Sequence, residues 1–157
     1  MKKKYSLRPM TEADLPFLTA LYASTRSQEM AQVPWSDQEK LDFLQGQFHA
    51  QHTFYQDNFP NSSFDLIVVD KKEAGRLYLD EREDEFRIID IALLPEYRGA
   101  GIGRTILEDV QDQAKDVAKK VRIHVEKNNP AMSLYKRLNF TDVEDQGVYQ
   151  LMEWNPE

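Results

Sequence analysis

The alternation of apolar and polar positions predicts two helices in the first third of the chain. Thr11 precedes acidic residues and then an apolar set at helical spacing, and Ser36–Glu39 has the form of a capping box ahead of a second such set. We therefore expect one helix that ends near Thr25 and a second that runs from about Asp37 to Gln56.

Strand patterns occupy the middle of the chain. The turn-forming residues 57–62 are followed by short runs rich in β-branched and aromatic side chains, separated by polar turns. These runs predict strands at residues 64–69, 74–79 and 85–94. Because the connecting segments are short, the strands should form an antiparallel meander.

The helical period returns after the third of these strands. One apolar stripe is formed by Ile102, Ile106, Val110, Ala114 and Val117. Residues 121–125 then form a short strand, and a strand, a helix and a strand in this order predict a parallel pair joined by a right-handed crossover. A short helix at 130–138 and strands at 140–143 and 148–154 complete a mixed α/β sheet.

Length and composition favour one compact domain over residues 1–157. The chain has no cysteine, which excludes disulfides, a thiolate zinc site and a thiol nucleophile and favours a reducing, cytoplasmic location. The formal net charge of −7 disfavours nucleic acid as a partner and favours a cationic one, such as a protonated amine. The basic start at residues 2–4 leads into no apolar segment, and no apolar run is long enough to span a membrane.

The glycine-rich turn at residues 98–105 has the features of an anion-binding site. It stands between the strand that ends near Leu94 and the helix that begins near Gly101, so its backbone N–H groups point outward at a helix N-terminus. Its glycines lack the Cβ atoms that would keep a pyrophosphate from the backbone, while Arg98 and Arg104 add positive charge. We favour phosphate binding over a purely structural turn.

Two other phosphate-binding loops do not match this turn. A Walker A loop needs a lysine before its Ser or Thr, whereas Thr105 follows Arg104 and the glycine spacing is wrong. In the dinucleotide fingerprint the third glycine would come one residue after Gly103, and too little chain follows for a doubly wound sheet.

The turn resembles the coenzyme A motif of the GNAT superfamily of N-acetyltransferases. That motif, Arg/Gln-x-x-Gly-x-Gly/Ala at the start of a helix, corresponds here to Arg98–Gly103. A second family motif, Asn-x-x-Ala-x-x-x-Tyr-x-x-x-Gly-Phe, is similar to Asn128–Phe140. Asn139 stands where glycine is usual, and asparagine tolerates the left-handed backbone expected there. The resemblance is specific over about residues 88–140.

The resemblance implies a mostly antiparallel central sheet, flanking helices, and two parallel strands that splay apart around the pantetheine arm of acetyl-coenzyme A. It implies acetyl-coenzyme A as co-substrate, no metal, and a family in which homodimers through the last strands are common. The residues it places at the cofactor are Ile91 and Leu93 through their backbones, Arg98, Gly99, Ala100, Gly101, Gly103 and Arg104 at the pyrophosphate, Asn128 at the pantetheine arm, and Tyr135 at the thioester sulfur.

Attack by an amine on a thioester needs a group that takes the amine proton and a group that steadies the sulfur. Tyr135, with an ordinary pKa of ~10, suits a hydrogen bond to sulfur better than full proton transfer. Asp90 interrupts an apolar strand, which favours either a general base in a cavity or a structural ion pair. The candidates for the acceptor pocket are Glu29, Trp35, His52 and Tyr55, with Glu126.

The sequence thus predicts an N-acetyltransferase for a primary amine, either a small amine or an amine of a protein or peptide. One alternative is a non-catalytic acyl-coenzyme A sensor, which would keep the glycine turn but could dispense with Tyr135. Another is a binder of nucleotide phosphates, which the missing lysine and metal-binding acid disfavour.

Overall fold

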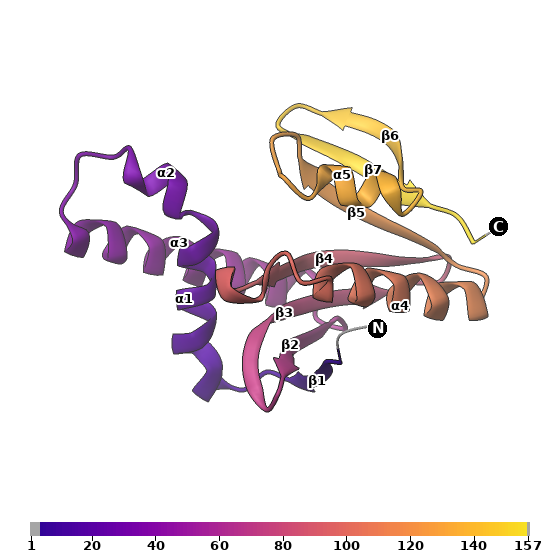
Figure 1. Cartoon of the computed structure of the whole chain (residues 1–157), viewed down its shortest axis with the longest axis horizontal. Helices are drawn as coiled ribbons and strands as arrows, with labels where there is room; N and C mark the ends of the chain where they lie inside the picture. Colours follow the sequence, from indigo (N-terminus) through magenta and orange to yellow (C-terminus); the bar gives the residue numbers. More distant parts are fainter. Residues whose placement is uncertain (1–3, 157) are drawn as a thin grey trace.

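The computed structural model describes residues 4–156, so residues 2 and 3 of the basic start lie outside the described range. It contains one seven-stranded sheet in the order β1-β2-β3-β4-β5-β7-β6, in which only β4 and β5 pair in parallel (Figure 1). The expected mixed, mostly antiparallel sheet is therefore confirmed. The strands are β1 (Ser6–Pro9), β2 (Ser63–Val69), β3 (Lys72–Glu81), β4 (Glu85–Leu93), β5 (Lys120–Glu126), β6 (Thr141–Gln146) and β7 (Tyr149–Trp154).

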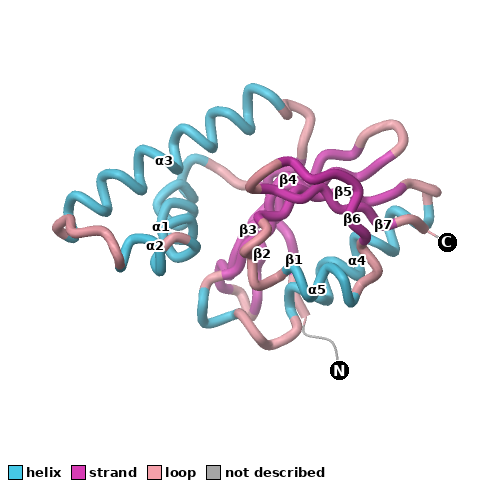
Figure 2. Tube along the Cα trace, turned by 90° about the horizontal axis from the view of Figure 1, so that it is seen from above, coloured by secondary structure: helices cyan, strands magenta, loops and turns pink. Residues whose placement is uncertain are grey.

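Helices cover both faces of this sheet. Figure 2 shows α1, α2 and α3 on one side of the strands and α4 and α5 on the other. The helices are α1 (Leu15–Thr25), α2 (Ser27–Ala31), α3 (Asp37–Asn58), α4 (Ile102–Asp116) and α5 (Met132–Arg137), with 3-10 turns at η1 (Glu12–Asp14) and η2 (Pro95–Tyr97). The short helix α2 had no sequence prediction, whereas α1 and α3 agree with the predicted helices within a few residues.

Helix α3 begins at the predicted capping box. The Glu39 N–H donates to Ser36 Oγ at 3.1 Å, and the Ser36 N–H donates to Glu39 Oε1 at 3.1 Å. Farther along the helix Phe48 is fully buried, but Leu41 near its start is 43% exposed. This difference arises because α2, residues 32–36 and the first turns of α3 project beyond the sheet as an arm (Figure 1).

Each face of the sheet has its own hydrophobic core. Leu66 packs with α1 and α3, while its neighbour Ile67 packs on the opposite face with α4, as alternation along a strand requires. The predicted α4 stripe is buried from Ile102 to Ala114, whereas Val117 follows the helix end and is 50% exposed.

The parallel strands β4 and β5 pair over only part of their length. Their register runs from Glu85 opposite Lys120 to Ile88 opposite Ile123. Beyond these residues β4 stays paired with β3 and β5 stays paired with β7, so the two strands diverge (Figure 1). The expected splay is therefore present, and it leaves a V-shaped gap in the sheet.

A β-bulge in β4 lies where this divergence begins. Leu79 on β3 is opposite Ile88 and Tyr78 is opposite Asp90, so Ile89 is the extra residue. A bulge bends its strand and increases the local twist, which turns the end of β4 away from β5. On its other side β4 stays close to β3. Glycine at position 75 permits this approach, because a Cβ there would lie 2.1 Å from the Ala92 oxygen.

Candidate active site

The turn before α4 presents a row of free backbone amides. Gly99 and Gly101 have φ of +76° and +86°, and a Cβ on either would point into open space. The first hydrogen bond into α4 runs from the Thr105 N–H to the Gly101 oxygen at 3.0 Å, and no acceptor among residues 4–156 bonds to the amides from Gly99 to Arg104. These donors at the start of a 15-residue helix fit a pyrophosphate.

This cradle lies beside the open end of the gap, because β4 runs toward that end and the turn follows it (Figure 1). Arg98 ties the turn to the end of β4 by donating from Nε to the Leu93 oxygen at 2.9 Å and from Nη2 to Ser24 Oγ at 3.4 Å. Arg104 is 55% exposed and lies 3.8 Å from Glu108. Because Arg98 already bonds the Leu93 carbonyl, the backbone of Ile91 is better placed than that of Leu93 to bond a ligand in the gap.

Tyr135 lies on α5 with its ring in the core and no hydrogen-bond partner for its hydroxyl among the described residues. The side chain is 4% exposed, and its ring packs edge to face on Phe140 with centroids 5.6 Å apart. Burial, and secondly the charge of Asp90, raise the pKa of Tyr135 well above its usual value. The hydroxyl therefore keeps its proton and is free to donate it in a hydrogen bond.

The turn residues around α5 have separate roles. Asn129 Oδ1 accepts a hydrogen bond from the Ala131 N–H at 2.8 Å, which fixes the turn into α5. Asn128 is exposed, and its side chain bonds to no other described residue, so it can reach a ligand. Asn139 has φ of +70°, which confirms the left-handed backbone predicted after this helix.

Asp90 is paired with a buried arginine on the neighbouring strand. Arg76 Nη2 donates to Asp90 Oδ2 and also to Gln51 Oε1, the latter at 2.8 Å. The Arg76 side chain is only 3% exposed, whereas that of Asp90 is 22% exposed. The ion pair that the sequence left as one hypothesis is therefore present, and the general-base role of Asp90 stays a prediction.

Arg76 was missed by the sequence analysis. The available signal was an arginine inside the apolar strand pattern of β3, where it interrupts the run as Asp90 interrupts the run in β4. Two charged residues of opposite sign in neighbouring apolar strands indicate a pair.

Two of the acceptor-pocket candidates lie close to this pair. Tyr55 packs edge to face on Tyr78, with centroids 6.0 Å apart, and burial followed by the charge of Asp90 raises its pKa. His52 is 7% exposed and stacks on Phe48 at 5.5 Å. Burial, followed by the charge of Arg76, lowers the pKa of His52, so this ring is neutral at neutral pH.

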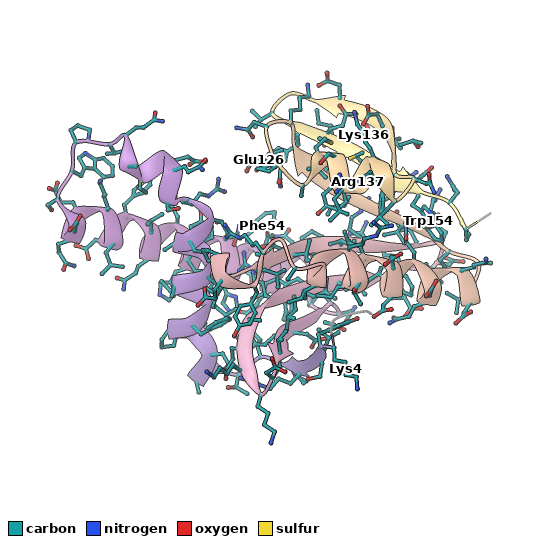
Figure 3. The ribbon with its side chains drawn as sticks, viewed as in Figure 1. Lys4, Phe54, Glu126, Lys136, Arg137 and Trp154 are labelled. Carbon is teal, nitrogen blue, oxygen red and sulfur yellow. The ribbon has the colours of Figure 1, made fainter. Side chains whose placement is uncertain are left out.

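The other candidates lie elsewhere. Trp35 stacks on Phe43 in the arm, with centroids 5.3 Å apart. Phe43 precedes Tyr55 by 12 residues of α3, and a rise of ~1.5 Å per residue separates them by about 18 Å, so Trp35 and Tyr55 do not line one small pocket. Glu29 and Glu126 both contact Arg26, at 3.2 and 3.5 Å, and Figure 3 places Glu126 at the end of β5 that faces the arm.

Within residues 4–156, no group of three or more His, Cys, Asp or Glu side chains is placed to hold a metal ion. No helix in that range is long and apolar enough to cross a membrane.

Comparison with known sequences identifies a matching family and two relatives. A sequence model described as the acetyltransferase (GNAT) family matches residues 22–140. A Bacillus subtilis (strain 168) protein, named provisionally as a ribosomal protein bS18-alanine N-acetyltransferase, is 26% identical over 141 residues, covering 87% of this chain and 81% of that protein. An N-alpha-acetyltransferase of Sulfurisphaera tokodaii is 36% identical over 59 residues, or 36% of this chain and 35% of that protein.

Solved structures share the fold at lower identity. The PaiA N-acetyltransferase of Thermoplasma acidophilum in complex with coenzyme A has a TM-score of 0.72 and 18% identity, with 97% of this chain and 99% of that chain covered. The ribosomal-protein-S18-alanine N-acetyltransferase of Escherichia coli has a TM-score of 0.60 and 20% identity, with 96% and 91% covered. Because the matched family segment contains the amide cradle, the diverging strands and Tyr135, the chain belongs to the acetyltransferase (GNAT) family and is an acetyl-coenzyme A-dependent N-acetyltransferase.

Proposed function

We propose that this chain transfers the acetyl group of acetyl-coenzyme A to the α-amino group of a protein or peptide. The observation that supports the site is the divergence of β4 and β5 directly beside the free amides of residues 99–104. The amides hold the pyrophosphate, and the backbone of Ile91 and the side chain of Asn128 bond the pantetheine arm. The thioester supplies an activated acetyl carbon at the gap.

The proposed chemistry is direct attack by the amine. The ammonium group first loses one proton to Asp90, and the nitrogen lone pair then forms the new C–N bond. The C–S bond breaks with its electron pair left on sulfur, and the second amine proton ends on the sulfur. Tyr135 donates a hydrogen bond to the sulfur as charge grows there, and its raised pKa supports this role over release of its own proton.

An α-amino group suits the electrostatics of the gap. Its pKa is ~7.7–8.0, so neutralising it at pH 7 costs about 1 kcal/mol, whereas a lysine amine with a pKa of ~10.4 costs about 4 to 5 kcal/mol. Both carboxylates at the gap are held by arginines, Asp90 by Arg76 and Glu126 by Arg26. The α-amino group therefore needs less from a base at the gap than a lysine amine does, and the names of the two sequence relatives support the same acceptor class.

The single-domain organisation, the cytoplasmic location and a homodimer through the last strands stay predictions from the sequence.

Two measurements test the proposed function. Thermal unfolding is followed with acetyl-coenzyme A, ATP or NAD, and only acetyl-coenzyme A should raise the melting temperature, because a ligand of the folded state stabilises it. Stabilisation by ATP alone would contradict the cofactor assignment.

Release of free thiol is then measured with a peptide that has a free N-terminal alanine and no lysine. The matched control is the same peptide with a blocked N-terminus and one internal lysine. We expect the first to be acetylated about tenfold faster or more at pH 7. Equal or faster acetylation of the lysine peptide would exclude the α-amine preference.

A further inference from the structure

We infer that Arg76 is a positioning residue for acetyl transfer: it holds one oxygen of Asp90 so that the other faces the gap and takes the proton of the acceptor amine. This inference rests on the proposed function. It assigns a catalytic purpose to a buried ion pair that could otherwise serve stability alone.

The β-bulge decides which way Asp90 points. Ile88 packs in the core beneath α4, and in a regular strand Asp90, two residues later, would point into the same apolar core. The extra residue Ile89 reverses the alternation, so that Ile91 packs toward α4 and Asp90 points toward Arg76 on the opposite face. The bulge that opens the gap therefore also brings the carboxylate to its edge.

The two carboxylate oxygens of Asp90 have different surroundings. Oδ2 accepts the hydrogen bond from Arg76 Nη2, while Oδ1 accepts none from any residue in the range 4–156. The side chain keeps 22% of its surface exposed, although its partner is 3% exposed. One oxygen is thus held by Arg76, and the other is free to accept a hydrogen bond from an acceptor amine.

The surroundings of Arg76 satisfy its guanidinium only in part. The guanidinium lies 4.9 Å from the Tyr78 ring centroid and 5.9 Å from that of Phe48, which are favourable cation–π contacts, but its Nε and Nη1 atoms are buried with no hydrogen-bond partner. Replacing a buried ion pair by apolar residues of similar volume is often neutral or stabilising. A buried ion pair whose polar atoms are not all hydrogen-bonded is better explained by a role in the reaction than by stability alone.

Among the described groups that face Asp90, Arg76 is the one that carries a positive charge at neutral pH. Tyr78 comes from β3, Tyr55 from α3 and Tyr135 from α5, and each tyrosine keeps its proton because burial raises its pKa. His52, beside Arg76, stays neutral because burial lowers its pKa. Arg76 is therefore the described cation that holds Asp90 in place.

The test compares Arg76→Met, Asp90→Asn and the double variant by thermal unfolding, acetyl-coenzyme A affinity and the pH dependence of kcat. Arg76→Met alone should unfold at a lower temperature, because it leaves the Asp90 charge unpaired. The double variant should recover most of the lost thermal stability, because no unpaired charge remains. Its affinity for acetyl-coenzyme A should be within about twofold of the wild-type affinity. Its kcat should stay about 10²-fold below wild type, since the proton acceptor is absent.

A structural role predicts a different result: once stability returns, activity should return with it. A stable double variant with kcat near wild type would therefore overturn the inference. The matched control is Arg122→Met with Glu153→Gln, which removes an ion pair at 2.7 Å between β5 and β7, away from Asp90, and should leave kcat unchanged.

Arg76→Lys covers the case in which the double variant does not fold. Lysine keeps the charge but lacks the planar fork, so Asp90 should be held less well, with kcat about tenfold lower and unchanged affinity for acetyl-coenzyme A. A wild-type kcat in this variant would contradict the positioning role. If the wild-type protein releases no thiol with any amine, the proposed function fails; if it does and the variants match it, only the role of Arg76 fails.

Discussion

The role we propose for the Tyr135 hydroxyl is to steady the departing sulfur. Burial and the nearby charge of Asp90 both act against its ionisation, so it enters the reaction protonated. In this proposed role, its interaction with sulfur would strengthen only as negative charge develops there, which would lower the barrier without tightening cofactor binding.

Tyr135→Phe should therefore lower kcat by about 10²-fold while changing the affinity for acetyl-coenzyme A by about twofold or less. Steady-state kinetics and a thermal-shift titration check the two quantities. Tyr5→Phe is the control: it removes a hydrogen bond of 2.7 Å to Asp109 and should reduce stability by about 1 kcal/mol with kcat unchanged. A collapse of cofactor affinity in Tyr135→Phe would make this tyrosine structural.

Substitution by alanine should change the stability of the protein in opposite directions at two of its glycines. Gly101→Ala places a Cβ in the amide cradle on a residue with φ of +86°, so it should weaken acetyl-coenzyme A binding about tenfold or more and cost about 1 kcal/mol of stability. Gly46→Ala, inside α3 with no atom within 4 Å of the new Cβ, should add about 0.5 to 1 kcal/mol and leave binding unchanged. Chemical denaturation and cofactor titration measure both effects.

At the scale of elements, the junction between β1 and α1 is held by one carboxylate. Asp14 accepts a fork from Arg8 on β1, at 2.8 and 2.9 Å, and a hydrogen bond from the Thr11 N–H at 2.8 Å. The Arg8 hydrogen bond is the largest cause that lowers the pKa of Asp14, to about 2. The ionised carboxylate thus joins the first strand to the helix that follows.

This arrangement predicts a pH dependence of stability. Because the folded pKa lies below the unfolded value of ~3.9, the stabilisation is complete above pH ~4 and is lost as the pH falls through about 2. Asp14→Asn should be about 1 to 2 kcal/mol less stable than wild type at pH 6, and the difference should shrink as the pH falls toward 2 and vanish below it. Urea unfolding at several pH values measures it; a constant difference across this range would refute the assignment.

At the scale of the whole molecule, the gap divides the sheet into β1–β4 and β5–β7. The short parallel register between β4 and β5 and the core under α4 hold the two parts together. That core includes residues from both parts, such as Ile67 and Met152, so the parts should unfold together.

The two tryptophans report on separate regions, since Trp35 lies in the arm and Trp154 on β7. Single-tryptophan variants, Trp35→Phe and Trp154→Phe, should give fluorescence unfolding curves whose midpoints each agree with circular dichroism of the same variant. Separate midpoints for the two regions would show that the single-domain prediction is wrong.

Local patterns were sufficient for most elements and for the cofactor motif. The capping box at Ser36, the α4 stripe and the left-handed Asn139 depend on side chains within a few residues of one another, so sequence spacing predicts them. The amide cradle belongs to the same class, because its glycines and the helix start are adjacent in the chain.

Tertiary structure decided what depends on distant partners. The bulge at Ile89 reversed the face of Asp90, and only the packing of β3 against β4 brought Arg76 to it. The acceptor candidates were separated because α3 extends beyond the sheet, which places Trp35 far from Tyr55. Periodicity in a sequence specifies which residues share a face, but the orientation of that face and its partners depend on contacts between segments far apart in the chain.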